Sequence, residues 1–116
     1  MAFATYLLDE ALTRRATQFE SDRQATLAKV ATMLQELGPR YRIERAWIFG
    51  SVIRPHRFTE DSDIDLAVEQ IEPTDFFNAI SAFSRYLGRE VDLVELKKCH
   101  FAHRIREHGI LWTRTR

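Results

Sequence analysis

Residues 63–68, with the sequence DIDLAV, constrain the fold of this chain more than any other segment. Aliphatic side chains alternate with aspartates, which predicts a strand whose buried face carries Ile64, Leu66 and Val68. Asp63 and Asp65 would then share the opposite face, roughly 6.5 Å apart along the strand. Two like charges so placed destabilise a sheet unless a cation lies between them, and Mg²⁺ binds through such carboxylates. A solvated strand face is the alternative for this pattern taken alone.

A second acidic strand is expected over residues 91–96, where Asp92 interrupts an otherwise apolar run. An aspartate buried there needs a cation or hydrogen-bond donors, whereas one at an edge position would face water. We favour the buried position. If this strand lies beside the first, three carboxylates converge, enough for two metal ions and a general base.

A third short strand, over residues 46–49, ends in Gly50-Ser51 and is followed by a polar loop over 52–62. Glycine lets the backbone approach a ligand closely, and serine offers a hydroxyl and an amide to a phosphate oxygen. Arg54 is a suitable phosphate partner. Gly-Ser after a strand is by itself a weak signal, since most instances are turns.

Helical periodicity accounts for most of the rest. A stripe at 27, 30, 31, 34 and 37 predicts a helix that Gly38-Pro39 ends, while Ser21 and Gln24 either start this helix or lie within a longer one. Thr74 is the expected N-cap of a second helix that ends at Gly88. Its apolar face would comprise Phe76, Phe77, Ile80, Phe83 and Leu87. A short helix over 99–108 and a possible edge strand over 109–112 follow. The expected fold class is α+β: a small mixed sheet of three to four strands with helices on one face, preceded by an N-terminal helical region.

Composition excludes several classes of protein. The 116 residues suit one domain (1–116), with a helical region over 1–38 and a catalytic core over 40–113. Seventeen basic and seventeen acidic residues give no net charge, so direct binding to nucleic acid is not expected. No apolar run is long enough to span a membrane. The single cysteine, Cys99, and a start that lacks signal-peptide features predict a cytoplasmic protein. Cys99, His100, His103 and His108 form one cluster, so we interpret them as incidental rather than as a zinc site.

Together these residues resemble the nucleotidyltransferase superfamily of the DNA polymerase β type, and specifically its minimal members. The matching pattern is an apolar strand with Gly50-Ser51, a loop with Arg54, then residues 62–66 (SDIDL) and 91–93 (VDL). The resemblance covers residues 40 to 113 and implies the fold of that superfamily. Two departures fall in the loop: it is one residue longer than usual, and Pro55 stands where the family has glycine.

The resemblance implies roles for these residues. Asp63 and Asp65 would hold two Mg²⁺ ions, and Asp92 would complete the metal site and activate the acceptor hydroxyl. A nucleoside triphosphate, ATP in the minimal members, would be bound by Gly50, Ser51, Arg54 and Ser62. The acceptor hydroxyl would attack the α-phosphorus and release pyrophosphate.

The resemblance also implies a partner. Minimal nucleotidyltransferases of this kind are antitoxins that transfer AMP to a tyrosine of a HEPN ribonuclease toxin, and the small size agrees with an acceptor borrowed from another protein. A non-catalytic antitoxin and a transferase for a small molecule, such as an antibiotic, are the alternatives. The sequence does not distinguish between a homo-oligomer and a hetero-oligomer. For the apolar N-terminal residues Phe3, Tyr6, Leu7 and Leu8, we favour core packing over contact with a second copy or a partner helix.

Overall fold

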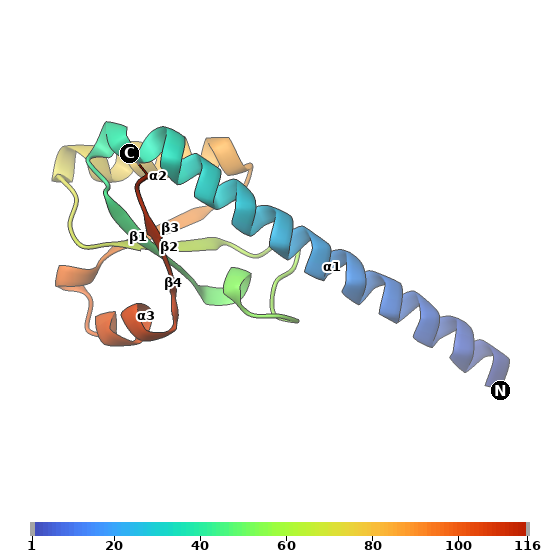
Figure 1. Ribbon diagram of the computed structural model, residues 1–116. Coiled ribbons are helices and arrows are strands. Elements are labelled where there is room, and N and C mark those ends of the chain that lie inside the picture. Colours follow the sequence, from blue (N-terminus) through green and yellow to red (C-terminus); the bar gives the residue numbers. More distant parts are fainter. Residues whose placement is uncertain (1, 116) are drawn as a thin grey trace.

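The computed structural model describes residues 2–115, with side chains from Thr5 onward. These residues form three helices and four strands (Figure 1). In order they are α1 (Ala2–Leu37), β1 (Arg45–Phe49), β2 (Ile64–Val68), α2 (Pro73–Leu87), β3 (Val91–Glu95), α3 (Ala102–His108) and β4 (Ile110–Thr113). Short 3₁₀ turns follow α1, β1 and β3 at Gly38–Tyr41, Gly50–Ile53 and Leu96–Lys98.

The four strands form one mixed sheet in the order β3-β2-β1-β4. β1 pairs antiparallel with β2 and with β4, whereas β2 and β3 run parallel. The parallel pair is joined through α2, because parallel neighbours need a crossover connection and a helix supplies it. This topology confirms the expected α+β class, and β4 is the edge strand expected near the C-terminus.

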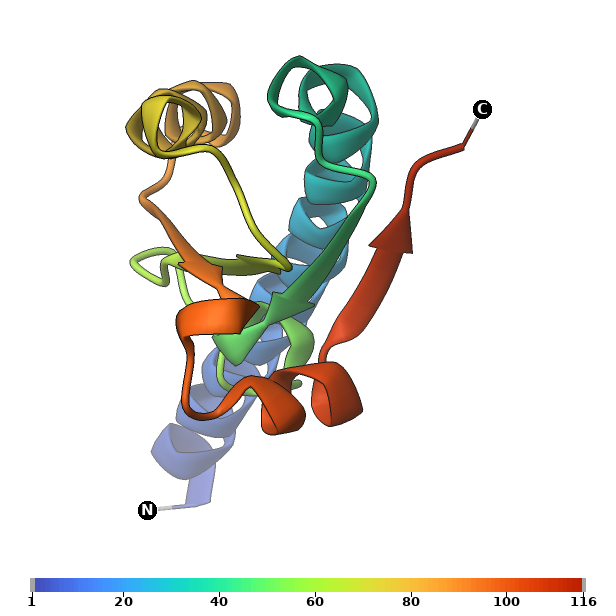
Figure 2. The same ribbon diagram turned by 90° about the vertical axis from the view of Figure 1, so that its left-hand side faces the viewer.

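Helices cover both faces of the sheet (Figure 2). α1 and α2 lie on the face where Ile64, Leu66 and Val68 are buried, as the alternation predicts. The expectation that the helices lie on one face of the sheet therefore holds for the two longer helices, α1 and α2. The short α3 packs on the other face, where Ile105 joins Trp47. Strand alternation places large apolar side chains on that face too, and they require a cover.

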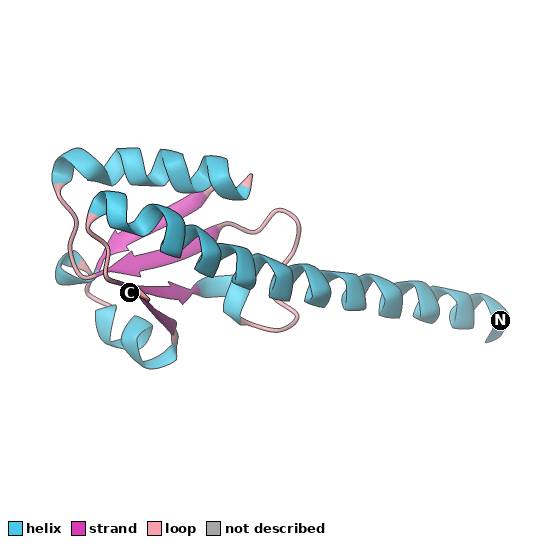
Figure 3. Ribbon diagram, turned by 45° about the horizontal axis from the view of Figure 1, so that its top comes forward, coloured by secondary structure: helices cyan, strands magenta, loops and turns pink. Residues whose placement is uncertain are grey.

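α1 is a single 36-residue helix, so Ser21 lies inside it and does not begin a second one. Its N-terminal half projects away from the domain (Figure 3). Tyr6, Leu7 and Leu8 are exposed, at 65%, 49% and 60%, and the prediction that they pack in the core is wrong. A straight helix of this length extends past the sheet that its other half covers. The Phe3 side chain lies outside the described residues. No helix within 2–115 is both long and apolar enough to cross a membrane.

The structure of α2 differs from the prediction in its N-cap and in the position of one phenylalanine. Glu72 rather than Thr74 is the N-cap, because Pro73 takes the first helical position, where its missing N–H is not needed. Phe77 is predicted to lie on the apolar face of this helix, but its side chain is 74% exposed, whereas Phe83 and Leu87 are buried. One helical step turns Phe77 about 100° away from Phe76 and out of the core. Gly88 ends the helix in the left-handed conformation, as expected.

Candidate active site

The acidic residues gather where β2 and β3 lie side by side. Asp65 is half-buried in the inner strand β2, and Asp92 of β3 is its partner in the parallel register. Paired residues of adjacent strands point to the same face. Burial, followed by the charges of Asp92 and Asp63, raises the pKa of Asp65 to about 6. The prediction that Asp92 is buried or half-buried is wrong: this side chain is exposed, because it points to the face of β3 opposite to the buried Val91 and Leu93. The two strands nevertheless bring the three carboxylates to one region.

Gly50 lies directly against Asp65. It follows β1, where Phe49 pairs with Asp65 across the sheet, and has a φ of +80°. A Cβ at position 50 would lie 3.0 Å from Cγ and 3.2 Å from Cβ of Asp65, and closer still to its Oδ2. Both the backbone conformation and the available space therefore require glycine here. The backbone turn after β1 and the carboxylate of β2 are in direct contact.

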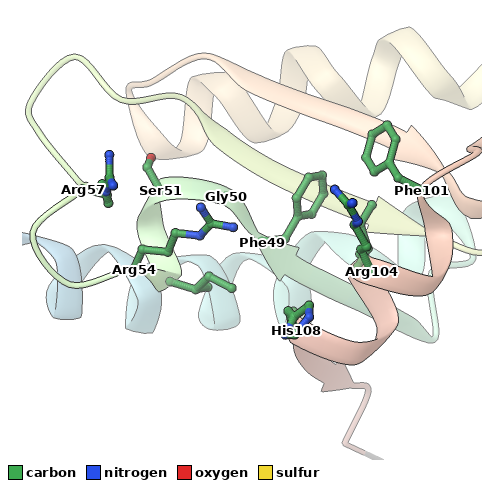
Figure 4. Close-up of a pocket in the computed structure, with 11 residues that line it drawn as sticks. Phe49, Gly50, Ser51, Arg54, Arg57, Phe101, Arg104 and His108 are labelled. Carbon is green, nitrogen blue, oxygen red and sulfur yellow. The ribbon is translucent and has the colours of Figure 1, made fainter.

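A pocket of about 740 Å³ opens beside this turn. Its walls come from the end of β1, the Gly50–Ile53 turn with the loop that follows, and α3 (Figure 4). The lining residues are Phe49, Gly50, Ser51, Ile53, Arg54, Arg57, Phe101, Arg104, Ile105, His108 and Gly109. Arg54 and Arg104 enter from opposite sides (Figure 4). Among residues 2–115, no carboxylate forms an ion pair with Arg54, Arg57 or Arg104. Three unpaired guanidinium groups in one pocket favour a ligand with several negative charges.

Comparison with models of known protein families identifies the family to which this chain belongs. Residues 29–115 match the family model of polymerase β nucleotidyltransferases, which is most of the chain. This chain belongs to that family. The match includes the carboxylates, the glycine turn and α3. A search of curated proteins finds no match.

The structure places most of the predicted site residues of this nucleotidyltransferase domain together. Gly50, Ser51 and Arg54 line the pocket, and Gly50 also contacts Asp65. Ser62 is not among the lining residues. Its Oγ accepts a hydrogen bond from the amide of Thr59 at 2.9 Å, so this hydroxyl orders the loop before β2.

Sequence reasoning missed the contribution of α3 and of Arg57. Phe101, Arg104 and His108 stand three and four residues apart, so they share one face of a helix, and that face lines the pocket. This spacing was visible in the sequence. It became meaningful only because β4 pairs with β1 and thereby brings α3 beside the Gly50 turn.

The donor chemistry of the acidic group suits a divalent cation. Asp63, Asp65 and Asp92 offer only carboxylate oxygens, the ligands that Mg²⁺ prefers. Within the part of the chain that the structure describes, no three acidic, histidine or cysteine side chains already form a coordination group. These residues fit a metal that would draw them together.

The raised pKa of Asp65 predicts how stability depends on pH. Because its pKa rises from the ordinary 3.8 to about 6, the folded protein holds this proton more tightly than the unfolded chain. Without metal, the free energy of unfolding should therefore fall as the pH rises from about 4 to about 6. We expect a fall of about 1 kcal/mol once solvent screening of the half-buried group is allowed for. Urea unfolding in EDTA across this range, compared with Asp65→Asn, measures it; identical pH profiles would contradict the assignment.

Proposed function

We propose that this nucleotidyltransferase depends on Mg²⁺ and transfers AMP from ATP to a hydroxyl group of a partner protein. We further propose that the acceptor is a tyrosine of a HEPN-type ribonuclease, which the modification silences, so that the chain acts as its antitoxin. The observation that carries the catalytic part is the position of Gly50. It meets the Asp65 carboxylate and also lines the pocket, in which three arginines have no ion-pair partner among the described residues. An anionic ligand in the pocket would therefore lie next to the acidic group.

The pocket residues would bind and orient the triphosphate. Arg54, Arg57 and Arg104 supply planar donors suited to phosphate oxygens, and the turn of Ser51 adds a hydroxyl and an amide. Phe49 and Phe101 offer apolar surface to the sugar or base. With the phosphates held this way, the α-phosphorus would lie toward Gly50 and the carboxylates.

The acidic residues would act on the acceptor. Asp92 is exposed, so an acceptor hydroxyl can reach it from solvent and give up its proton to this carboxylate. The hydroxyl oxygen then forms a bond to the α-phosphorus, the bond between the α-phosphorus and the bridging oxygen breaks, and pyrophosphate leaves with that oxygen. Asp63 and Asp65, with Asp92, would hold the Mg²⁺ ions. When bound, these ions neutralise the charge that develops on the attacking and leaving oxygens.

A protein acceptor is favoured by the openness of the acidic side of the site. Asp63 and Asp92 are both exposed, whereas the nucleotide side is a hollow lined by three structural elements. A large acceptor could therefore present its hydroxyl without entering a pocket. A small acceptor would find few walls among the described residues to hold it.

Labelled ATP tests the proposal directly. The chain is incubated with Mg²⁺, α-labelled ATP and the protein encoded by the neighbouring gene, and label on that protein is measured. Transfer to a tyrosine, lost when that tyrosine is changed to phenylalanine, supports the proposal. A tight complex without transfer would instead show a non-catalytic antitoxin. Transfer only to small hydroxyl compounds such as aminoglycosides would show a small-molecule transferase.

Arg104 should contribute to nucleotide binding. Replacing it with glutamine removes one of the unpaired cations of the pocket, so we expect the KM for ATP to rise about tenfold while kcat changes less. Steady-state transfer rates measure both constants. Arg106→Gln is the matched control, because Arg106 is also on α3 but pairs with Glu69 at 2.7 Å. An equal rise of KM in Arg104→Gln and Arg106→Gln would contradict a specific contact between Arg104 and the phosphates of ATP.

A further inference from the structure

Arg89 is bonded to the end of the loop that leads into β2. It lies in the two-residue connection between Gly88, the C-cap of α2, and β3. Its Nη1 donates hydrogen bonds to the carbonyl oxygens of Thr59, Glu60 and Ser62, at 3.2, 3.1 and 2.9 Å. Three carbonyl oxygens of one short loop segment thus converge on a single nitrogen. Such a cluster of partial negative charge is stabilised by a cation.

The same guanidinium group is held in place by an aromatic ring. Its Cζ lies 4.5 Å from the ring centroid of Phe58, which is only 3% exposed and belongs to the core. A cation over the face of a packed aromatic ring is attracted by the ring quadrupole and limited in its motion. Phe58 therefore anchors Arg89 to the core, and Arg89 in turn holds the loop.

These bonds connect the two segments that carry the acidic residues. The loop held by Arg89 continues directly into Asp63, and the segment that contains Arg89 continues through Glu90 into β3 and Asp92. Next to these bonds, the Ile64 amide donates to the Glu90 carbonyl oxygen at 2.9 Å. Asp63 itself is exposed and precedes the first residue of β2, so its position depends on the backbone that leads to it.

The remote end of the loop is held in a similar way. Arg23 of α1 donates from Nη1 to the Val52 carbonyl oxygen at 3.1 Å, and its guanidinium group is paired with Glu20. An arginine from outside the loop thus fixes each end of it. Between them lie Pro55 and the residue His56, which adopts a φ of +69°.

We infer that Arg89 is a positioning residue, which fixes Asp63 relative to Asp92 through the three carbonyl oxygens and the Phe58 ring. This inference rests on the proposed function, since it assumes that these carboxylates bind a divalent cation. Among the described residues, Arg89 does not line the nucleotide pocket and forms no ion pair with a carboxylate. Its effect is therefore on the acidic group and not on the nucleotide.

Arg89→Met tests the inference by removing the donors and keeping an unbranched chain against Phe58. We expect the dissociation constant for Mn²⁺, measured by electron paramagnetic resonance on the full chain, to rise about tenfold, as for other residues that orient metal ligands. The Mg²⁺ concentration for half-maximal AMP transfer should rise in parallel, and the KM for ATP should stay within about twofold. Arg89→Lys retains a cation of shorter reach, so its Mn²⁺ affinity should lie between wild type and Arg89→Met.

The matched control is Arg85→Met, on the last turn of α2. Arg85 is exposed, and within residues 2–115 it makes no side-chain hydrogen bond or ion pair, so Mn²⁺ binding should not change. If Arg89→Met does not fold by circular dichroism, Arg89→Lys decides alone: wild-type Mn²⁺ affinity in it overturns the inference. Lower thermal stability of Arg89→Met with unchanged Mn²⁺ affinity also overturns it and leaves Arg89 a purely structural residue. If the wild type binds no Mn²⁺, the proposed metal site itself fails.

Discussion

Asp65→Asn is expected to abolish AMP transfer and at the same time to make the metal-free protein more stable at neutral pH. Burial, followed by the charges of Asp92 and Asp63, disfavours the ionised form of this carboxyl group, so a neutral isostere removes a cost of folding. We expect a gain of about 1 kcal/mol after solvent screening, or about 4 °C in Tm. The rate of transfer should fall on the order of a thousandfold or more, because an anionic ligand of the catalytic ions is lost.

Both effects are measured on one preparation, by urea unfolding in EDTA at pH 7.5 and by transfer of labelled AMP. Asp61→Asn is the control, since Asp61 is an exposed carboxylate of the same region that makes no ion pair in the described structure. It should change neither quantity. A stability loss in Asp65→Asn would show that this carboxylate has stabilising partners. Wild-type transfer would remove it from the catalytic group.

Gly50→Ala should be the most damaging of the small substitutions. The added methyl group meets Asp65, and the φ of +80° is unfavourable for alanine. We expect a stability loss of about 2 kcal/mol or more from strain and overpacking together. Displacement of the turn or of Asp65 by the methyl group should lower the transfer rate about a hundredfold in the folded protein. Urea unfolding and single-turnover transfer measure the two effects.

Gly88→Ala separates backbone strain from steric conflict. Gly88 also has a positive φ, of +65°, but a Cβ there would have nothing within 4 Å. The substitution should therefore cost about 1 kcal/mol, from conformation alone, and leave the transfer rate of the folded protein unchanged. Equal stability losses at the two glycines would mean that Asp65 moves aside freely. The close contact between the Gly50 turn and the Asp65 carboxylate would then not be required for function.

The strands and the chemistry of the acidic residues can be predicted from the amino-acid sequence. Alternation in residues 63–68 predicts which side chains are buried in β2, because the pleat sends neighbours to opposite faces. The same pattern leaves Asp63 and Asp65 as a like-charge pair, and Gly38-Pro39 and Gly88 mark helix ends through backbone restrictions that are local. Such features depend on residues close in sequence, so they can be read without a structure.

Which of these residues come into contact depends on how distant segments of the chain pack together. Whether Asp92 lies beside Asp65 depends on the parallel pairing of β2 with β3. The pocket exists because β4 returns antiparallel to β1 and carries Arg104 toward the glycine turn. The three hydrogen bonds of Arg89 likewise join segments about 30 residues apart in the sequence. Pairing between distant segments is set by the packing of the whole chain, and no local pattern encodes it.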